Sequence, residues 1–225
     1  MTMRDDDAAI SSDYFANHAR ARQFPWTLYH GPLERDLARF LGRVAAEHPR
    51  GEVLVLGCGL LHEIDAVPDG LRFHVADIDE RAVAAVRARG DARITGGSVV
   101  VAEQAIDLGF RRFVAIYAKE VVEHVLAWPG WLAGLRRALV PGGRLWLSTP
   151  NYGEPWLAAL ESTVLEVVAR RSGFSRRDMH PTRFSRRSLA RGLRSVAFED
   201  VDVRVTPTRL ALMAWARAPE PKPAW

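Results

Sequence analysis

Short apolar runs alternate with amphipathic stretches through the first two thirds of the chain. Each run holds about five residues, a length typical of buried strands, whereas the stretches between them place apolar residues three and four positions apart, as on one face of a helix. The runs predict strands at 53–56, 71–76, 98–102, 113–117 and 144–148. The amphipathic stretches predict helices at 12–23, 32–48, 60–67, 80–89 and 131–139. Such alternation is the signature of an α/β fold with a doubly wound, mostly parallel sheet and right-handed connections.

The last third of the chain changes character. The pattern predicts, in order, helix 156–168, a charged loop at 172–182, helix 185–196 and strands at 199–205 and 210–216. Val201, Val203 and Val205 alternate with polar residues, as expected of a strand with one buried face. Because residues 206–209 are too few to cross between parallel strands, we expect the last two strands to form an antiparallel hairpin.

These elements divide the chain into an N-terminal helical lid, one α/β domain and a tail. Their expected bounds are 1–48 for the lid, 49–217 for the domain, with a substrate cap at about 151–184, and 218–225 for a flexible tail. An aromatic segment with Pro and Gly at 24–31 indicates a linker that packs on the domain or forms part of the lid. With 225 residues and 48% hydrophobic content, the chain can bury one continuous core.

Composition limits the cellular location and the kinds of site that we expect for this protein. The first seven residues are acidic rather than basic, and no apolar run approaches the length that crosses a bilayer, so we expect a cytoplasmic protein without a membrane partner. The single cysteine, Cys58, excludes an intrachain disulfide framework and a cysteine-rich zinc site. The sequence indicates no oligomeric state.

The net charge is +4, and nearly all of the positive charge is arginine, as a GC-rich bacterial coding bias would produce. One short segment concentrates it: Arg170, Arg171, Arg176, Arg177, Arg183, Arg186, Arg187, Arg191 and Arg194. This cluster suits a solvated helix face or an anionic acceptor, since guanidinium groups pair bidentately with carboxylate and phosphate. RNA binding is disfavoured because only Phe174 and Phe184 are interleaved with the arginines.

The run of apolar residues at 53–56 leads directly into Gly57-Cys58-Gly59, and Asp77 follows about twenty positions later. Glycine at the end of a buried strand permits a positive φ and a close backbone approach, which a nucleotide-like ligand needs at such a turn. The pattern therefore indicates a nucleoside cofactor. The third glycine of the dinucleotide fingerprint is absent, because Leu61 or His62 stands in its place.

Two further segments carry a resemblance to a known family. They are Lys119-Glu120-Val121-Val122-Glu123-His124-Val125, and Trp131-Leu132 followed by Leu139-Val140-Pro141-Gly142-Gly143 and Ser148-Thr149-Pro150-Asn151. In order and separation they resemble the Glu-His helix start, the Pro-Gly-Gly turn and the strand end of class I S-adenosylmethionine-dependent methyltransferases, in particular the small-molecule, ubiquinone-biosynthesis-type branch. The resemblance spans roughly residues 51–205, and His180 with Phe184 matches a later family motif.

The resemblance implies a Rossmann-like methyltransferase fold with seven strands, one of them antiparallel, and S-adenosyl-L-methionine as the cofactor. It implies that the glycine turn lines the methionine and ribose portions, that Asp77 accepts hydrogen bonds from both ribose hydroxyls, and that Lys119 borders the methionine end. A carboxylate suits two adjacent hydroxyls because it has two acceptor oxygens. For the adenine, the family pattern implies a contact with Ile78 and an acidic partner at Glu103.

The chain also departs from the family pattern. Val55 stands where family members usually have an acidic residue that helps to hold the cofactor's amino group, and a glycine is missing near Leu61. Glu63 or the amino-terminal segment is a candidate replacement for the missing acidic residue.

The expected reaction is methyl transfer to a small-molecule oxygen or nitrogen nucleophile, for which the protein mainly aligns the reactants and excludes water. His124 is the first candidate base, because histidine titrates near neutral pH, and His180 is the second. Glu120 is a candidate neighbour of the sulfonium cation, together with lid aromatics at Tyr14, Trp26 and Tyr29.

Several alternatives stay open at this point. His124 would equally suit a structural hydrogen bond at a helix start. The helical spacing of Glu120, Glu123 and His124 would suit a divalent ion that positions a catechol-like acceptor, although a structural role is favoured and we expect no metal ligand. An enzyme that consumes S-adenosylmethionine without methylation, for example by cyclising its aminobutyrate arm, and a binding module without activity are further alternatives.

Overall fold

The computed structural model describes residues 24, 27–67, 69–101, 112–155 and 180–221. The helices predicted at 12–23 and 156–168 lie outside this part of the chain, and so do most of the charged loop and of the predicted cap. The division into lid, domain, cap and tail therefore stays a prediction. Within the described residues, no helix is both long and apolar enough to span a bilayer.

Seven strands form one sheet in the order β3-β2-β1-β4-β5-β7-β6. Their bounds are β1 Glu52–Leu56, β2 Arg72–Asp77, β3 Ile94–Val99, β4 Phe113–Lys119, β5 Leu139–Pro150, β6 Glu199–Val205 and β7 Ala211–Arg217. Strands β1 to β5 pair in parallel, whereas β7 runs antiparallel to both β5 and β6. The predicted fold class and its closing hairpin are confirmed.

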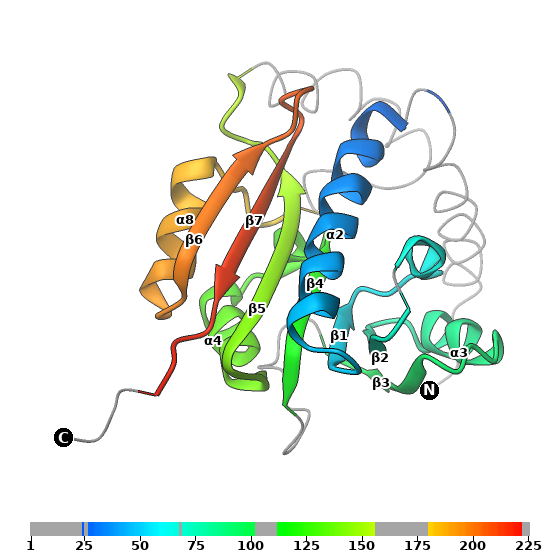
Figure 1. Ribbon diagram of the computed structural model, residues 1–225. Helices are drawn as coiled ribbons and strands as arrows, with labels where there is room; N and C mark the ends of the chain where they lie inside the picture. Colours follow the sequence, from blue (N-terminus) through cyan, green and yellow to red (C-terminus); the bar gives the residue numbers. More distant parts are fainter. Residues whose placement is uncertain (1–23, 25–26, 68, 102–111, 156–179, 222–225) are drawn as a thin grey trace, which may run out of the picture.

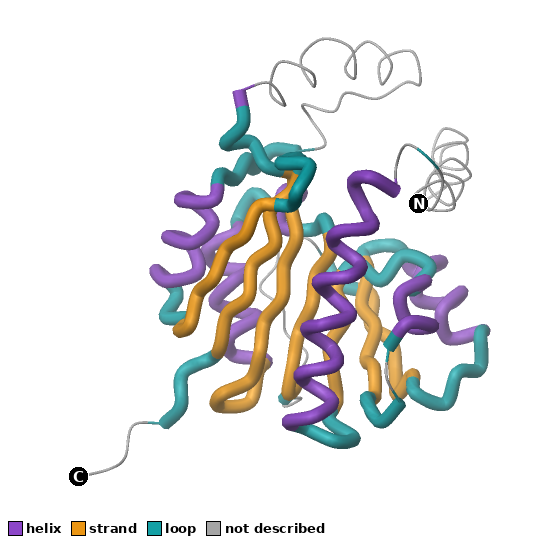
Figure 2. Tube along the Cα trace, turned by 45° about the horizontal axis from the view of Figure 1, so that its top comes forward, coloured by secondary structure: helices purple, strands orange, loops and turns teal. Residues whose placement is uncertain are grey.

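Helices cover both faces of this sheet, as Figures 1 and 2 show. Their bounds are α2 Thr27–Glu47, α3 Glu80–Ala88, α4 Trp128–Ala138 and α8 Arg186–Ser195, with 3₁₀ turns η1 His62–Ala66 and η2 Val122–His124. The alternation along β1 divides the core in two: Val53 and Val55 pack with α2, α3 and η1, whereas Leu54 and Leu56 pack with α4 and α8. One strand with period-2 alternation thus joins both halves of the core.

Several predicted boundaries differ from the structure. The helix predicted at 60–67 is the shorter 3₁₀ turn η1, and α4 begins at Trp128 and not at Trp131. Helix α2 begins at Thr27 and not at Pro32, because the side chain of Tyr29 packs against the core beneath the helix. Strand β3 ends at Val99, whereas the apolar pattern placed the strand at 98–102. Strand β5 follows α4 immediately and includes the Pro-Gly-Gly sequence, which forms an irregularity in its pairing with β4.

Candidate functional site

The carboxyl ends of β1, β2, β4 and β5 meet at one edge of the sheet, and the predicted site residues gather there. Gly57 and Cys58 both donate their backbone N–H to the carbonyl of Ala76, at 2.9 and 3.2 Å, so the turn after β1 is fixed to the end of β2. Gly57 has φ of 66°, and a Cβ there would lie 2.5 Å from the Val121 side chain. Only glycine fits this turn without strain.

Asp77 is buried at the end of β2, where its carboxylate joins the glycine turn to the loop after β2. The backbone N–H of Gly59 donates to Oδ2 at 2.9 Å, and that of Asp79 donates to Oδ1 at 3.0 Å. A carboxylate has about four lone-pair sites, so each oxygen can accept a further hydrogen bond from a ligand. The geometry places Asp77 directly beside the turn, as the sequence predicts.

Three apolar side chains are exposed at the same edge, next to Asp77. Ile78 is 65% exposed, Val99 57% and Val101 58%, and all three follow or end the strands β2 and β3. Exposed side chains of this size at a strand end offer a flat apolar surface for an aromatic base. Glu103, the predicted partner of the adenine amino group, lies outside the described residues.

Cys58 lies in the glycine turn with its thiol buried. Burial raises the pKa of this thiol, and the negative charges of Asp77 and Glu63 raise it further. The thiol is therefore protonated at neutral pH and is neither a nucleophile nor a metal ligand. Cys58 contributes its backbone N–H and its small volume to the turn.

Lys119, at the end of β4, pairs with Glu63 of η1. Lys119 Nζ lies 3.3 Å from Glu63 Oε2, and both side chains are mostly buried. Glu63 therefore places a carboxylate close to the glycine turn, although the strand position Val55 carries no acidic group. This carboxylate is the one that the sequence offered as a replacement, and it comes with a lysine partner.

Glu120 is the first residue after β4 and adopts a left-handed backbone conformation with φ of 57°. Its Oε1 accepts a hydrogen bond from Ser148 Oγ at 2.8 Å, and its Oε2 accepts a short hydrogen bond from the hydroxyl of Tyr29. Burial raises the pKa of Tyr29 well above its usual value, and the adjacent Glu120 carboxylate raises it further, so the hydroxyl stays a donor. Left-handed non-glycine residues cost about 1–2 kcal/mol and cluster at functional sites.

His124 and His180 lie in edge-to-face contact, with ring centroids 4.8 Å apart. His180 is buried, whereas His124 is exposed at the end of η2. The hydroxyl of Tyr152 lies 2.6 Å from His180 Nδ1, and the guanidinium of Arg183 lies 5.1 Å from the centre of the Tyr152 ring. Glu123 completes this group, because its carboxylate and the two imidazoles have ligand atoms within 4.8 Å of one another.

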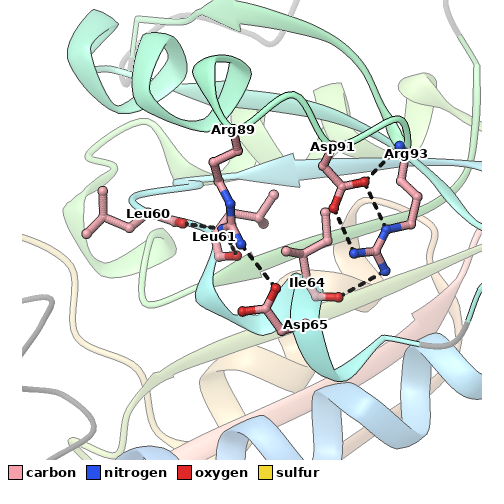
Figure 3. A network of polar contacts seen from close by, with 7 residues as sticks. All are labelled: Leu60, Leu61, Ile64, Asp65, Arg89, Asp91 and Arg93. Atoms are coloured by element: carbon pink, nitrogen blue, oxygen red, sulfur yellow. Dashed lines mark hydrogen bonds and ion pairs between the residues drawn. The ribbon is translucent and has the colours of Figure 1, made fainter.

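Two arginines fix the segment that follows the glycine turn (Figure 3). Arg89 Nη1 donates to the carbonyls of Leu60 and Leu61 at 3.1 and 3.0 Å, and its Nη2 lies 3.1 Å from Asp65. Arg93 donates to the carbonyl of Ile64 at 3.1 Å and pairs with Asp91, whose pKa it lowers to about 2. The end of α3 and the loop after it thereby anchor η1, which carries Glu63.

The structure brings together the predicted residues at strand ends and Glu63, which the sequence offered as a replacement, and it adds Ser148 and Tyr152 as polar partners. Sequence reasoning gave no role to Ser148 or Tyr152, although Ser148 belongs to the Ser-Thr-Pro-Asn strand end that carried the family resemblance and Tyr152 follows it directly. The carboxylate of Glu120 is not part of the group formed by Glu123 and the two histidines, contrary to the helical spacing considered for a metal. Tyr14 and Trp26 lie outside the described residues.

Comparison with known proteins places this fold in a class. A family model described as a methyltransferase domain matches residues 16–203, and the chain belongs to that family. S-adenosylmethionine is the cofactor that this membership indicates, and the residues fit it: a carboxylate beside a glycine turn, with apolar side chains exposed next to it. A comparison with curated proteins found no match.

The solved structures that resemble the chain share its fold at low sequence identity. N-methyltransferase NodS from Bradyrhizobium japonicum, in complex with S-adenosylhomocysteine, is 19% identical with a TM-score of 0.60, covering 92% of this chain and 99% of its own. The [4+2]-cyclase SpnF is 16% identical with a TM-score of 0.62, covering 82% and 81%. The CurJ carbon methyltransferase is 16% identical with a TM-score of 0.63, covering 83% of this chain and 54% of its own. The same fold therefore carries different chemistry, and the reaction has to be argued from the site.

Proposed function

We propose that this protein transfers a methyl group from S-adenosylmethionine to an oxygen or nitrogen nucleophile of a small molecule. The observation that carries the proposal is the buried Asp77 carboxylate, which accepts the Gly59 N–H at the glycine turn and has lone pairs for a vicinal diol. The bound cofactor would supply an electrophilic methyl group on a sulfonium centre. The protein then has to bind it, orient the acceptor and exclude water.

At the methionine end, Glu63 and Lys119 provide one group of each sign. Glu63 would bind the α-amino group of the cofactor, and Lys119 would bind its carboxylate. Each side chain of the ion pair would then contact the ligand group of opposite charge. This arrangement assigns to η1 a role that the family usually gives to an acidic residue in the strand, at the position of Val55.

At the reacting end, Glu120 places negative charge near the sulfonium, and Tyr29 and Ser148 orient its carboxylate. His124 is exposed and lies at the end of η2, a few residues beyond Glu120, where it would accept a proton from the acceptor. An acceptor that carries negative charge would also suit the arginines of α8, Arg186, Arg187, Arg191 and Arg194.

The cofactor assignment is tested by calorimetry with S-adenosylmethionine and S-adenosylhomocysteine on wild type and Asp77→Asn. We expect the variant to bind about 10- to 100-fold more weakly, because one acceptor oxygen for the diol is replaced by an amide nitrogen. Asp202→Asn, on the exposed side of β6, is the matched control and should bind as wild type does. A melting curve without ligand separates lost binding from lost folding, and equal affinity of Asp77→Asn and wild type would refute the diol assignment.

The reaction class is tested by incubating the protein with methyl-labelled S-adenosylmethionine and pooled hydroxyl and amine acceptors, followed by mass spectrometry. Methyl transfer predicts labelled acceptor and S-adenosylhomocysteine in equal amounts. Formation of methylthioadenosine without any acceptor would instead show cyclisation of the aminobutyrate arm, and would overturn the proposed methyl transfer while leaving the cofactor assignment intact.

A further inference from the structure

Two segments far apart in the sequence meet beside the candidate site. The backbone N–H of Thr182 donates to the carbonyl of Glu123 at 3.1 Å, and the Thr182 hydroxyl donates to the carbonyl of Val125 at 2.9 Å. These two hydrogen bonds join the residues after His180 to the turn η2. The backbone that carries His180 is thereby held next to the turn that carries His124, and the centroids of the two rings lie 4.8 Å apart.

The groups that meet there form a mixed set of metal-binding donors. Glu123 is buried and supplies a carboxylate, and His124 and His180 supply imidazoles, with donor atoms all within 4.8 Å of one another. Around a cation with bonds of about 2.1 Å, neighbouring and opposite ligand atoms lie about 3.0 to 4.2 Å apart. The observed separations, all within 4.8 Å, lie close to that range, and the His124 side chain is exposed at the end of η2.

We propose that Glu123, His124 and His180 bind a divalent transition-metal ion such as Mn²⁺, Fe²⁺ or Zn²⁺. Two imidazoles and one carboxylate suit these ions, whereas Mg²⁺ and Ca²⁺ prefer a set made of oxygen atoms. Three protein ligands leave coordination positions for water or for another ligand. The site differs from the one that the spacing along the chain suggested, because His180 takes the place of Glu120.

Tyr152 orients one of the three proposed ligands, His180. Its hydroxyl engages His180 Nδ1 at 2.6 Å, so the ligand nitrogen of His180 is Nε2. Metal-binding histidines usually have such a partner on the other ring nitrogen, which fixes the tautomer and the direction of the ring. Tyr152 is itself held, since its backbone N–H donates to the carbonyl of Phe184 at 2.9 Å.

The position of this site connects it to catalysis. Glu123 lies three residues beyond Glu120, which the proposed function places at the reacting end. A cation held there would bind an oxygen of the acceptor and favour its deprotonated form, with the proton released to water. With the metal bound, His124 is then a ligand and no longer the base. This consequence rests on the proposed methyl transfer, whereas metal binding does not.

The test is a titration of the full chain, without an affinity tag and dialysed against EDTA, with Co²⁺ as the probe. We expect one Co²⁺ per chain with visible absorption bands, and affinity at least tenfold lower in His124→Ala. A melting curve without metal checks that this variant folds. Tyr152→Phe should still bind Co²⁺, but about tenfold more weakly. His48→Ala, at the opposite edge of the sheet before β1, is the control and should bind as wild type does.

Equal Co²⁺ affinity in wild type and His124→Ala, or no stoichiometric binding by wild type, would overturn the proposal. Calorimetry with S-adenosylhomocysteine in EDTA distinguishes it from the proposed function, because cofactor binding requires Asp77 but not the metal. A protein that binds Co²⁺ at this site but fails to bind S-adenosylhomocysteine would retain the metal site and lose the methyltransferase assignment. A protein that binds S-adenosylhomocysteine but not Co²⁺ would refute only the metal site and leave the methyltransferase assignment intact.

Discussion

At the scale of single residues, Glu120 concentrates the unusual features of this site. It has a left-handed backbone although it is not glycine, and two hydroxyl groups donate to its carboxylate. Because one donor is Tyr29, from a helix ninety-one positions away in sequence, the conformation of Glu120 depends on how α2 packs. The carboxylate is thus positioned by the fold as a whole and not by its own strand.

Replacing Tyr29 with Phe removes one of these donors and keeps the ring. We expect Tyr29→Phe to lose about 1 kcal/mol of unfolding free energy at pH 7.5, the usual net value of such a hydrogen bond. Burial and Glu120 raise the pKa of Tyr29 in the folded state above the usual value of 10.0, so the folded protein holds this proton more tightly than the unfolded chain. The stabilisation is therefore full below pH 10 and is lost as the pH rises from there towards the raised pKa.

Urea unfolding of both proteins at pH 7.5 and pH 10.5 measures this difference. The gap between wild type and Tyr29→Phe should shrink at the higher pH. Tyr117, whose pKa burial also raises, is present in both proteins, so its contribution cancels in the comparison. A gap that is the same at both pH values would show that the Tyr29 hydroxyl does not keep its proton as the structure implies.

At the scale of elements, we expect a Gly→Ala substitution to destabilise the turn after β1 and to stabilise the middle of α2. Gly57→Ala introduces a Cβ at φ of 66° and 2.5 Å from Val121, so we expect a loss of about 2 kcal/mol or more. Gly42 lies inside α2 with no atom within 4 Å of an added Cβ. Gly42→Ala should therefore gain about 0.4–1 kcal/mol through lower chain entropy and better helix propensity.

Thermal melting of the two variants checks this pair directly. Melting temperatures that both fall would show that α2 tolerates added volume less well than its contacts indicate. A Gly57→Ala variant as stable as wild type would mean that the glycine turn can adopt another conformation, and calorimetry with S-adenosylhomocysteine would then show whether the turn still binds the cofactor.

Elements could be predicted well where apolar runs are buried on both faces, as in β1 and β4. Strand β3 was misplaced because Gly96 and Gly97 interrupt its apolar pattern. The structure shows why glycine is needed: a Cβ at Gly97 would lie 2.6 Å from Val83, and one at Gly96 would lie 2.9 Å from His74. Close packing against α3 and β2 thus overrides strand propensity, and such packing is not visible in a single sequence.

At the scale of the whole molecule, long-range packing also limits how much of the site a single sequence can predict. Residues that end strands, such as Asp77 and Lys119, could be predicted because the sheet topology brings strand ends together. The pairs Tyr29 with Glu120 and His124 with His180 could not, since each joins segments whose separation in the chain carries no period or motif. These long-range contacts decide which groups act together.

The packing of α2 on the sheet depends on one buried carboxylate. Asp36 is 3% exposed, and its Oδ2 accepts hydrogen bonds from the indole N–H groups of Trp146 at 2.9 Å and Trp215 at 2.8 Å. Arg39 of α2 and Arg204 of β6 each lie 3.6 Å from Oδ1, and Arg204 also lies above the Trp215 ring, so two guanidinium groups balance the buried charge. The carboxylate therefore joins α2 to β5, β6 and β7 at once.

Asp36→Ala should consequently destabilise the whole domain rather than α2 alone. Two indole donors lose their acceptor, which costs about 2–4 kcal/mol and lowers the melting temperature of a chain of this size by about 5 to 12 °C. Arg35→Ala, at an exposed position of the same helix, is the control and should melt within about 1 °C of wild type. Hydrogen exchange should show faster exchange throughout α2 in Asp36→Ala, and with it weaker protection at Tyr29, because the same helix holds Glu120. If only the last turns of α2 exchanged faster, the helix would be anchored by its apolar face alone, and the Glu120 carboxylate would be independent of the tryptophan pair.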